Sequence, residues 1–109
     1  MAKVNEIVWR LGIPATYQGQ RYLIAALKLA VNDESYLIHI KSLYEEVAKM
    51  YDVTVGSVVK DIRTVIAFCW SQGHREFLQQ MAGFPLTKRP TPANFISILT
   101  TYLLRNSSY

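Results

Sequence analysis

Two cations three positions apart, Lys60 and Arg63, stand near the end of the stretch EEVAKMYDVTVGSVVKDIR, residues 45–63. If this segment is helical, the spacing places both side chains on one face. There an arginine can bind O6 and N7 of a guanine with two parallel hydrogen bonds, and a lysine can bind a phosphate or a base. The chemistry that this pair suggests is recognition of a nucleic acid.

Neutral side chains beside the two cations fit the same interpretation. Gly56 would let a DNA backbone approach closely, Ser57 could hydrogen-bond a base edge or a phosphate, and Val59 could pack on a thymine methyl group. The whole face opposite the apolar stripe carries Val55, Gly56, Ser57, Val59, Lys60, Arg63 and Thr64. A plainer interpretation stays open, in which the cations are a solvated surface and Val59 is a partly buried packing residue.

A helix must be positioned before its side chains can enter a groove, and the residues around this one meet the packing demands of a helix-turn-helix. A small residue, Ala48, stands where the second helix would cross the first. Val53 supplies an apolar residue that points inward from the turn, and Thr54 follows as N-cap of the second helix. Val58 and Ile62 then continue a core stripe. The sequence predicts a helix-turn-helix over about residues 42–72.

Two details of this motif depend on single residues. The usual turn glycine is replaced by Asp52, which tolerates a left-handed backbone better than most residues. Ser42 and Glu45 have the spacing of a capping box, so we expect the first helix to begin at Ser42. A helical hairpin without any DNA-binding role could show the same pattern.

The rest of the chain also predicts helices, because apolar residues recur at helical spacing and no clean two-residue alternation runs between turn signals. Gly12, Gly73 and Gly83 supply helix ends, and a basic, proline-rich loop follows Gly83. We expect helices over residues 4–11, 20–31, 42–51, 54–72, 74–82 and 94–105. The predicted fold is all-α, a compact bundle of about six helices in a single domain over residues 1–109.

Composition fits a small folded protein with an anionic partner. Half of the 109 residues are hydrophobic, and twelve Lys and Arg against eight Asp and Glu give a formal charge of +4. This charge favours a nucleic acid without proving one. The single cysteine, Cys69, excludes an internal disulfide, and its apolar neighbours favour a buried, unreactive thiol. Because the sequence shows neither a membrane span nor a signal peptide, we expect a cytoplasmic protein.

No pattern in the sequence favours an enzyme. It contains no glycine-rich phosphate loop, no HExxH and no GxSxG. His39 and His74 lie far apart without an obvious carboxylate partner, and Glu45 and Glu46 would point about 100° apart on a helix. We therefore expect no catalysis, no cofactor and no metal ion.

An ordered set of short motifs resembles a known family. The string IRTVIAFCWSQG, residues 62–73, is similar to the IR…W-S-x-G stretch of the DNA-binding effector domain of the sporulation initiation response regulator of endospore-forming Firmicutes. The similarity extends through GIPA at 12–15, G-x-x-Y-L…A at 19–25, ND at 32–33, LY…VAKMY at 43–51 and RPT…F at 89–95. Each motif alone is weak, but the ordered set is specific and covers nearly the whole chain.

The resemblance implies an all-helical effector domain, of a type without a winged helix, whose helix-turn-helix enters the major groove of short promoter boxes. In that family the boxes often lie in tandem, and adjoining protomers touch through the C-terminal region. By position, Lys60 replaces a base-contacting arginine and Arg63 keeps an arginine that contacts DNA. Thr54 and a basic loop with Lys88 and Arg89 would lie near the DNA backbone. RNA polymerase and a full-length regulator are further candidate partners.

Two residues depart from the family pattern. Ser57 stands where the family usually has an arginine, and Val59 stands where it has a glutamate. Since each such contact is worth roughly 1–3 kcal/mol of base discrimination, we expect the same docking mode with a weakened or redirected sequence preference. The family's regulator also carries a phosphate-accepting receiver domain, and we expect none within these 109 residues.

The same departures leave an alternative function open. The chain could be a paralogous interaction module that pairs with a full-length regulator and has lost or altered its DNA reading. Its docking surface would use Phe95, Tyr102 and Leu103 of the last helix, which on a simpler interpretation pack in the core. DNA binding is favoured over this alternative by four cations, Lys60, Arg63, Lys88 and Arg89.

Overall fold

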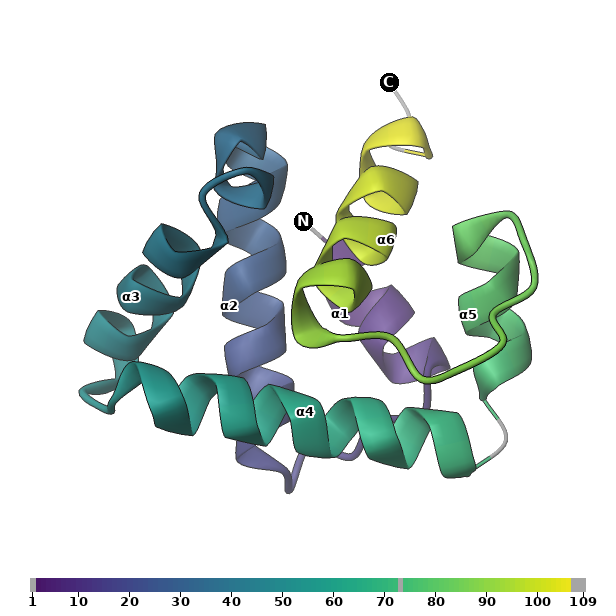
Figure 1. The fold of residues 1–109 in the computed structure, drawn as a ribbon, viewed down its shortest axis with the longest axis horizontal. Coiled ribbons are helices and arrows are strands. Elements are labelled where there is room, and N and C mark those ends of the chain that lie inside the picture. Colours follow the sequence, from purple (N-terminus) through teal and green to yellow (C-terminus); the bar gives the residue numbers. More distant parts are fainter. Residues whose placement is uncertain (1, 73, 107–109) are drawn as a thin grey trace.

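The computed structural model describes residues 2–72 and 74–106, which form six α-helices and one short 3₁₀ helix (Figure 1). In chain order they are α1 (Ala2–Arg10), α2 (Gln18–Asn32), the 3₁₀ helix η1 (Glu34–Leu37), α3 (Ile40–Tyr51), α4 (Val55–Ser71), α5 (Arg75–Ala82) and α6 (Pro92–Arg105). The described part of the chain contains no strand. The predicted all-α bundle of about six helices is therefore confirmed.

The helices surround one hydrophobic core to which all six contribute buried side chains. Helix α2 occupies the centre and packs against α1, α3, α4 and α6. Helix α4 crosses one end of this arrangement, with α3 at its N-terminal end and α5 at its C-terminal end (Figure 1). One long face of α4 is therefore covered by the rest of the molecule.

The closest approach between α2 and α4 occurs at Gly19. A β-carbon at this position would collide with the main-chain carbonyl oxygen of Asp61 and would lie 2.9 Å from Val65 Cγ1. Glycine is required here because it has no side chain and lets the two helix backbones touch. The contact fixes the middle of α4 against the first turn of α2.

Most helix ends lie where the sequence predicts them. Gly12 (φ 77°) and Gly83 (φ 83°) adopt the left-handed conformation that ends α1 and α5. Asp33 caps η1 by accepting a hydrogen bond from the Ser35 N–H at 3.1 Å. Helix α4 ends at Ser71, and the stop expected at Gly73 lies outside the described residues.

The expected start of α3 at Ser42 was wrong. The helix begins at Ile40 with His39 as N-cap, and no side chain caps it. The reason is the preceding η1, after which the His39 carbonyl already accepts hydrogen bonds from the N–H groups of Ser42 (3.0 Å) and Leu43 (3.3 Å). Ser42 therefore lies inside the first turn, and the predicted capping box with Glu45 does not form.

Helix α6 also begins earlier than expected, at Pro92 instead of Asn94. Thr91 is its N-cap, and the Thr91 hydroxyl oxygen accepts a hydrogen bond from the Asn94 N–H at 3.2 Å. Proline suits the first helical position because its fixed φ is helical and it has no N–H to leave unpaired.

Candidate nucleic-acid interface

A three-residue turn, Asp52–Thr54, joins α3 to α4 in the layout of a helix-turn-helix. Asp52 has φ 53° and ψ 50°, the left-handed conformation that the sequence analysis expects from it in place of glycine. The Val53 N–H then donates to the Ala48 carbonyl at 3.0 Å, which closes the end of α3. The amides of Asp52 and Val53 are thus both hydrogen-bonded to the last turn of α3.

The first turn of α4 is held by a pair of hydroxyl groups. The Thr54 hydroxyl oxygen accepts a hydrogen bond from the Ser57 N–H at 3.0 Å and donates one to the Ser57 hydroxyl oxygen at 3.0 Å. Thr54 is therefore the predicted N-cap, and its hydroxyl hydrogen and one of its two lone pairs are engaged by the helix itself. The Ser57 hydroxyl hydrogen remains free to donate outward, as do the first-turn N–H groups of Val55 and Gly56.

The inner face of α4 is an unbroken apolar stripe. It consists of five side chains that are at most 1% exposed: Val58, Ile62, Val65, Ile66 and Cys69. Ala48 is buried where α3 meets α4, and Val53 packs against the core from the turn, as the motif requires. Burial raises the pKa of the Cys69 thiol to about 11, so this thiol is neutral and unreactive near pH 7.

The outer face of α4 carries Gly56, Lys60, Arg63 and Thr64, all exposed. The Thr64 hydroxyl donates to the Lys60 carbonyl at 3.1 Å, so toward a ligand it can act only as an acceptor. A β-carbon at Gly56 would have one neighbour within 4 Å, Thr54 Oγ1 at 3.9 Å. The fold therefore does not require glycine at position 56.

Three predicted contact residues flank this face and are half-buried: Val55, Ser57 and Val59. Val55 and Val59 pack against the hydrophobic core. For Val59 the structure thus favours the plainer of the two interpretations, that of a packing residue. Of the seven contact residues predicted on α4, only Gly56, Lys60, Arg63 and Thr64 are exposed.

The two cations on the outer face form no ion pair with any carboxylate of the described residues. The ion pair that does form joins Lys49 and Glu46 within α3 at 3.6 Å. Burial raises the pKa of the Tyr44 hydroxyl on α3, and the nearby Arg63 guanidinium opposes this shift by a smaller amount. The sequence alone does not indicate that Tyr44 lies near Arg63, because the apolar spacing of α3 assigns Tyr44 only to the core.

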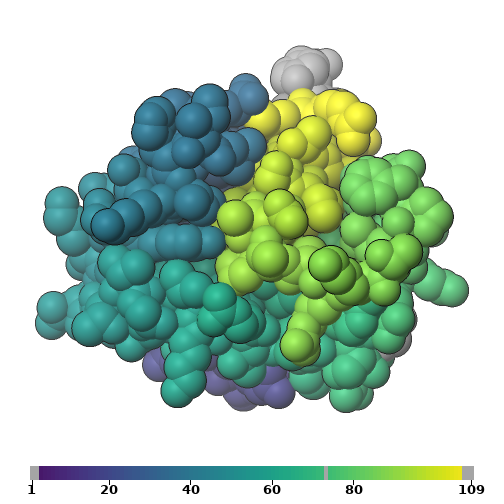
Figure 2. Space-filling view, viewed as in Figure 1, coloured from purple at the N-terminus to yellow at the C-terminus, as the bar shows by residue number. Residues whose placement is uncertain are grey.

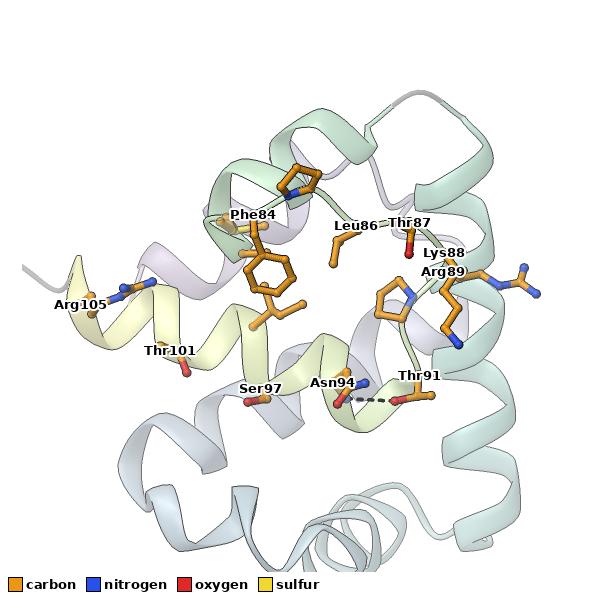
Figure 3. A pocket seen from close by; sticks show the side chains of 15 residues that line it. Phe84, Leu86, Thr87, Lys88, Arg89, Thr91, Asn94, Ser97, Thr101 and Arg105 are labelled. Atoms are coloured by element: carbon orange, nitrogen blue, oxygen red, sulfur yellow. Dashed lines mark hydrogen bonds between the residues drawn. The ribbon is translucent and has the colours of Figure 1, made fainter.

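Lys88 and Arg89 are exposed in the loop between α5 and α6. The loop is tied to α5 by the Leu86 N–H, which donates to Gln79 Oε1 at 2.9 Å. It borders the surface of α4 on the face shown in Figure 2. A groove of about 570 Å³ separates the loop from α6, with Lys88 and Arg89 at one end and Arg105 at the other (Figure 3).

Residues 4–103 match the family model described as sporulation initiation factor Spo0A C terminal. The chain belongs to this family. The Spo0A C-terminal domain is a DNA-binding effector domain of a sporulation regulator, so the resemblance read from the motifs is confirmed and DNA binding is supported at the family level. It is not a family of enzymes.

The last helix of this Spo0A C-terminal domain, α6, packs its apolar side chains in the hydrophobic core. Phe95 and Leu103 are buried, and Tyr102 is half-buried with its ring edge against Phe77, 6.3 Å between centroids. The simpler of the two interpretations of these residues is therefore correct. They do not offer the docking surface that the alternative function would need.

The described residues of this Spo0A C-terminal domain do not meet the requirements of a metal site or of a membrane-spanning helix. Within residues 2–72 and 74–106, no group of three or more His, Cys, Asp and Glu side chains could hold a metal ion. None of the helices in the described part of the chain is long and apolar enough to cross a membrane. His39 is an exposed surface residue whose Nδ1 lies 3.1 Å from the Ser35 carbonyl oxygen.

Proposed function

We propose that this chain binds double-stranded promoter DNA sequence-specifically by placing the N-terminal half of α4 in the major groove. It would act there as a transcription regulator of sporulation or a related developmental programme. The observation that carries the proposal is the pair Lys60 and Arg63, exposed and unpaired on the outer face of a helix whose inner face is fully buried. Unpaired cations on a rigid helix need little rearrangement to bind an anion.

The dimensions of α4 suit this role. An α-helix with its side chains is about 10–12 Å across, and the major groove of B-DNA is about 12 Å wide. The contacts of α4 with α2, α3, α5 and α6 hold it at the edge of the molecule, where one long face stays uncovered. This face would meet the base edges, with α3 behind it.

Each exposed group has a distinct task in the proposed complex. Arg63 would read a guanine through O6 and N7, and Lys60 would bind a base or a phosphate. The Ser57 hydroxyl and the free first-turn N–H groups of α4 would donate to phosphate oxygens, helped by the positive end of the helix dipole. Thr54 supports these contacts as the cap, because its own hydroxyl is engaged.

The basic loop supplies contacts that carry no sequence information. Lys88 and Arg89 are exposed, and the loop to which they belong borders α4 (Figure 2). We expect them to bind the sugar–phosphate backbone beside the groove that α4 occupies. Such contacts would add affinity for any duplex and make binding sensitive to salt.

The target sequence should differ from that of relatives that keep the family pattern. Ser57 and Val59 replace an arginine and a glutamate, and both side chains are short and half-buried. They can contribute less to base discrimination than the longer residues they replace. On tandem promoter boxes, adjoining copies of this chain would touch through the C-terminal region. Its protein partner would be RNA polymerase or a full-length regulator.

The proposal is tested by fluorescence anisotropy of labelled duplexes titrated with the protein over a series of salt concentrations. One set of duplexes comes from promoter regions and a matched set has shuffled sequence. We expect log K to fall linearly with log salt, because bound cations release counterions from the phosphates, and at least one promoter duplex to bind more tightly than its shuffled partner. An affinity that is independent of salt would overturn the proposal.

A further inference from the structure

The surface formed by α1 and α5 contains none of the residues of the proposed DNA interface. It carries Trp9, whose side chain is 78% exposed, although tryptophan is highly buried on average. Trp9 borders a shallow hollow of about 610 Å³, whose lining is Trp9, Arg10, His74, Glu76, Phe77 and Gln80. A hollow of this size can accept a large side chain from another molecule.

A second hollow continues the same surface along α5. It shares Glu76 and Gln80 with the first and ends at Phe84, which is 57% exposed. Exposed aromatic residues and arginine with no lysine are typical of the centre of a protein–protein interface. Tryptophan is also the residue type that most often dominates the binding energy of such interfaces. We call this surface, from Trp9 to Phe84, the α1–α5 face.

The charges on the α1–α5 face are compatible with a second copy of this chain as the partner. With histidine neutral, one cation, Arg10, and one anion, Glu76, line the hollow, so this face is neutral on a chain of net charge +4. The two side chains form no ion pair with each other, and the Arg10 guanidinium instead lies 4.1 Å above the Phe77 ring. A neutral face neither attracts DNA nor repels a second basic chain.

The α1–α5 face carries a protruding side chain, Trp9, beside a hollow, and it carries one positive and one negative charge. Such a face can be complementary to a second copy of itself. Around a two-fold axis, residue i of one copy meets residue j of the other, and j meets i in return. We propose that two copies of this chain pair through the α1–α5 face. Trp9 of each copy fills the hollow of the other, and Arg10 of each lies against Glu76 of the other.

This pairing is independent of the proposed DNA binding. Helix α5 packs against α4 near its C-terminal end, whereas Gly56 and Lys60 lie in the N-terminal half of α4 and Arg63 lies at its midpoint (Figure 1). Pairing therefore leaves the outer face of α4 open and needs no DNA. It also differs from a contact through the C-terminal region between protomers on tandem boxes.

The first test is sedimentation equilibrium of the 109-residue chain without DNA, up to millimolar concentration. The wild-type protein should show a monomer–dimer equilibrium, and Trp9→Ala should raise the dimer dissociation constant at least about 30-fold, the effect of losing a dominant interface side chain. The matched control is Ile38→Ala, which removes an apolar side chain that is 81% exposed on another surface and should leave the constant unchanged. A wild-type chain that stays monomeric would overturn the proposal and leave the face to a different partner.

The second test uses charge reversal. Arg10→Glu and Glu76→Arg should each abolish the dimer, because like charges then meet at both contacts. An equimolar mixture of the two variants should form a heterodimer, since opposite charges then meet at both. Circular dichroism checks that each variant is folded. Dimers that survive either single reversal, or a mixture that remains monomeric while the wild type dimerises, would show that the Arg10–Glu76 contact is wrong.

Discussion

The two faces of α4 differ in what surrounds them. The inner face places Val58, Ile62 and Cys69 in the shared hydrophobic core, with no solvent contact. The outer face places Lys60 and Arg63 in solvent, where no other described residue pairs with them. One helix therefore contains residues that packing requires and residues that packing does not use.

Because of this difference, the stability of the fold depends on one face of α4 and the binding of a ligand depends on the other. Close packing makes an inner-face substitution costly whatever the protein binds. The outer face makes no contribution to the core, so its cations must be explained by a ligand or by solubility alone. Substitutions on the two faces should therefore change different measured quantities, and each prediction below can break that separation.

The largest effect is expected on the inner face. Ile62→Ala should lower the free energy of unfolding by about 2–5 kcal/mol, because Ile62 is fully buried and its removal leaves a cavity between α4 and α2 or α3. Urea denaturation followed by far-ultraviolet circular dichroism measures this change. A loss below about 1 kcal/mol would mean that the inner face is packed more loosely than the structure shows.

The next effect is expected on the outer face. Arg63→Ala should weaken binding to the preferred duplex by about 1–3 kcal/mol and relax the preference at one base pair. Its free energy of unfolding should change by less than about 0.5 kcal/mol, because the side chain is exposed. Lys49→Ala is the matched control, since Lys49 is an exposed cation on α3, paired with Glu46. Equal losses of affinity in the two variants would indicate a net-charge effect instead of base reading.

A smaller effect is expected from the loop that borders α4. Lys88→Ala or Arg89→Ala should weaken promoter and shuffled duplexes by the same factor and make the slope of log K against log salt shallower by about 1. The reason is the loss of one phosphate contact without a change in base reading. Anisotropy over the salt series measures both quantities. A loss confined to one sequence would place these residues at the bases.

The smallest effect is expected at Gly56 and has opposite signs for the two quantities. Gly56→Ala should raise the free energy of unfolding by up to about 1 kcal/mol, since alanine restricts the unfolded chain and its β-carbon meets open space. The same β-carbon should reduce DNA affinity if the backbone of α4 approaches a phosphate at this point. Thermal unfolding and anisotropy on one sample show both, and an unchanged affinity would remove Gly56 from the interface.

The sequence predicts the inner face of α4 better than the outer one. Apolar spacing from Val58 to Cys69 determines which side is buried, and Asp52 and Thr54 reveal the turn through their backbone preferences. Solvent exposure has no comparable period, so the sequence did not show that Val59 is half-buried and packs against the core.

Features that depend on tertiary contacts could not be read from local sequence. The early start of α3 follows from η1, and the closeness of Arg63 to Tyr44 depends on how α3 crosses α4. The hollow beside Trp9 combines residues of α1 and α5 that lie more than sixty positions apart. Apolar periodicity assigns residues to a face but does not show which faces remain uncovered.

The most direct test of the proposed interface is a nitrogen-15 NMR titration of the protein with a duplex that contains its preferred site. We expect the largest amide shift changes on the outer face of α4, over residues 56–64, and in the loop at Lys88 and Arg89. The indole N–H of Trp9, on the α1–α5 face, should keep its chemical shift when DNA is added. Changes centred on α1 and α5, with α4 unaffected, would contradict the assignment of the outer face of α4 to DNA.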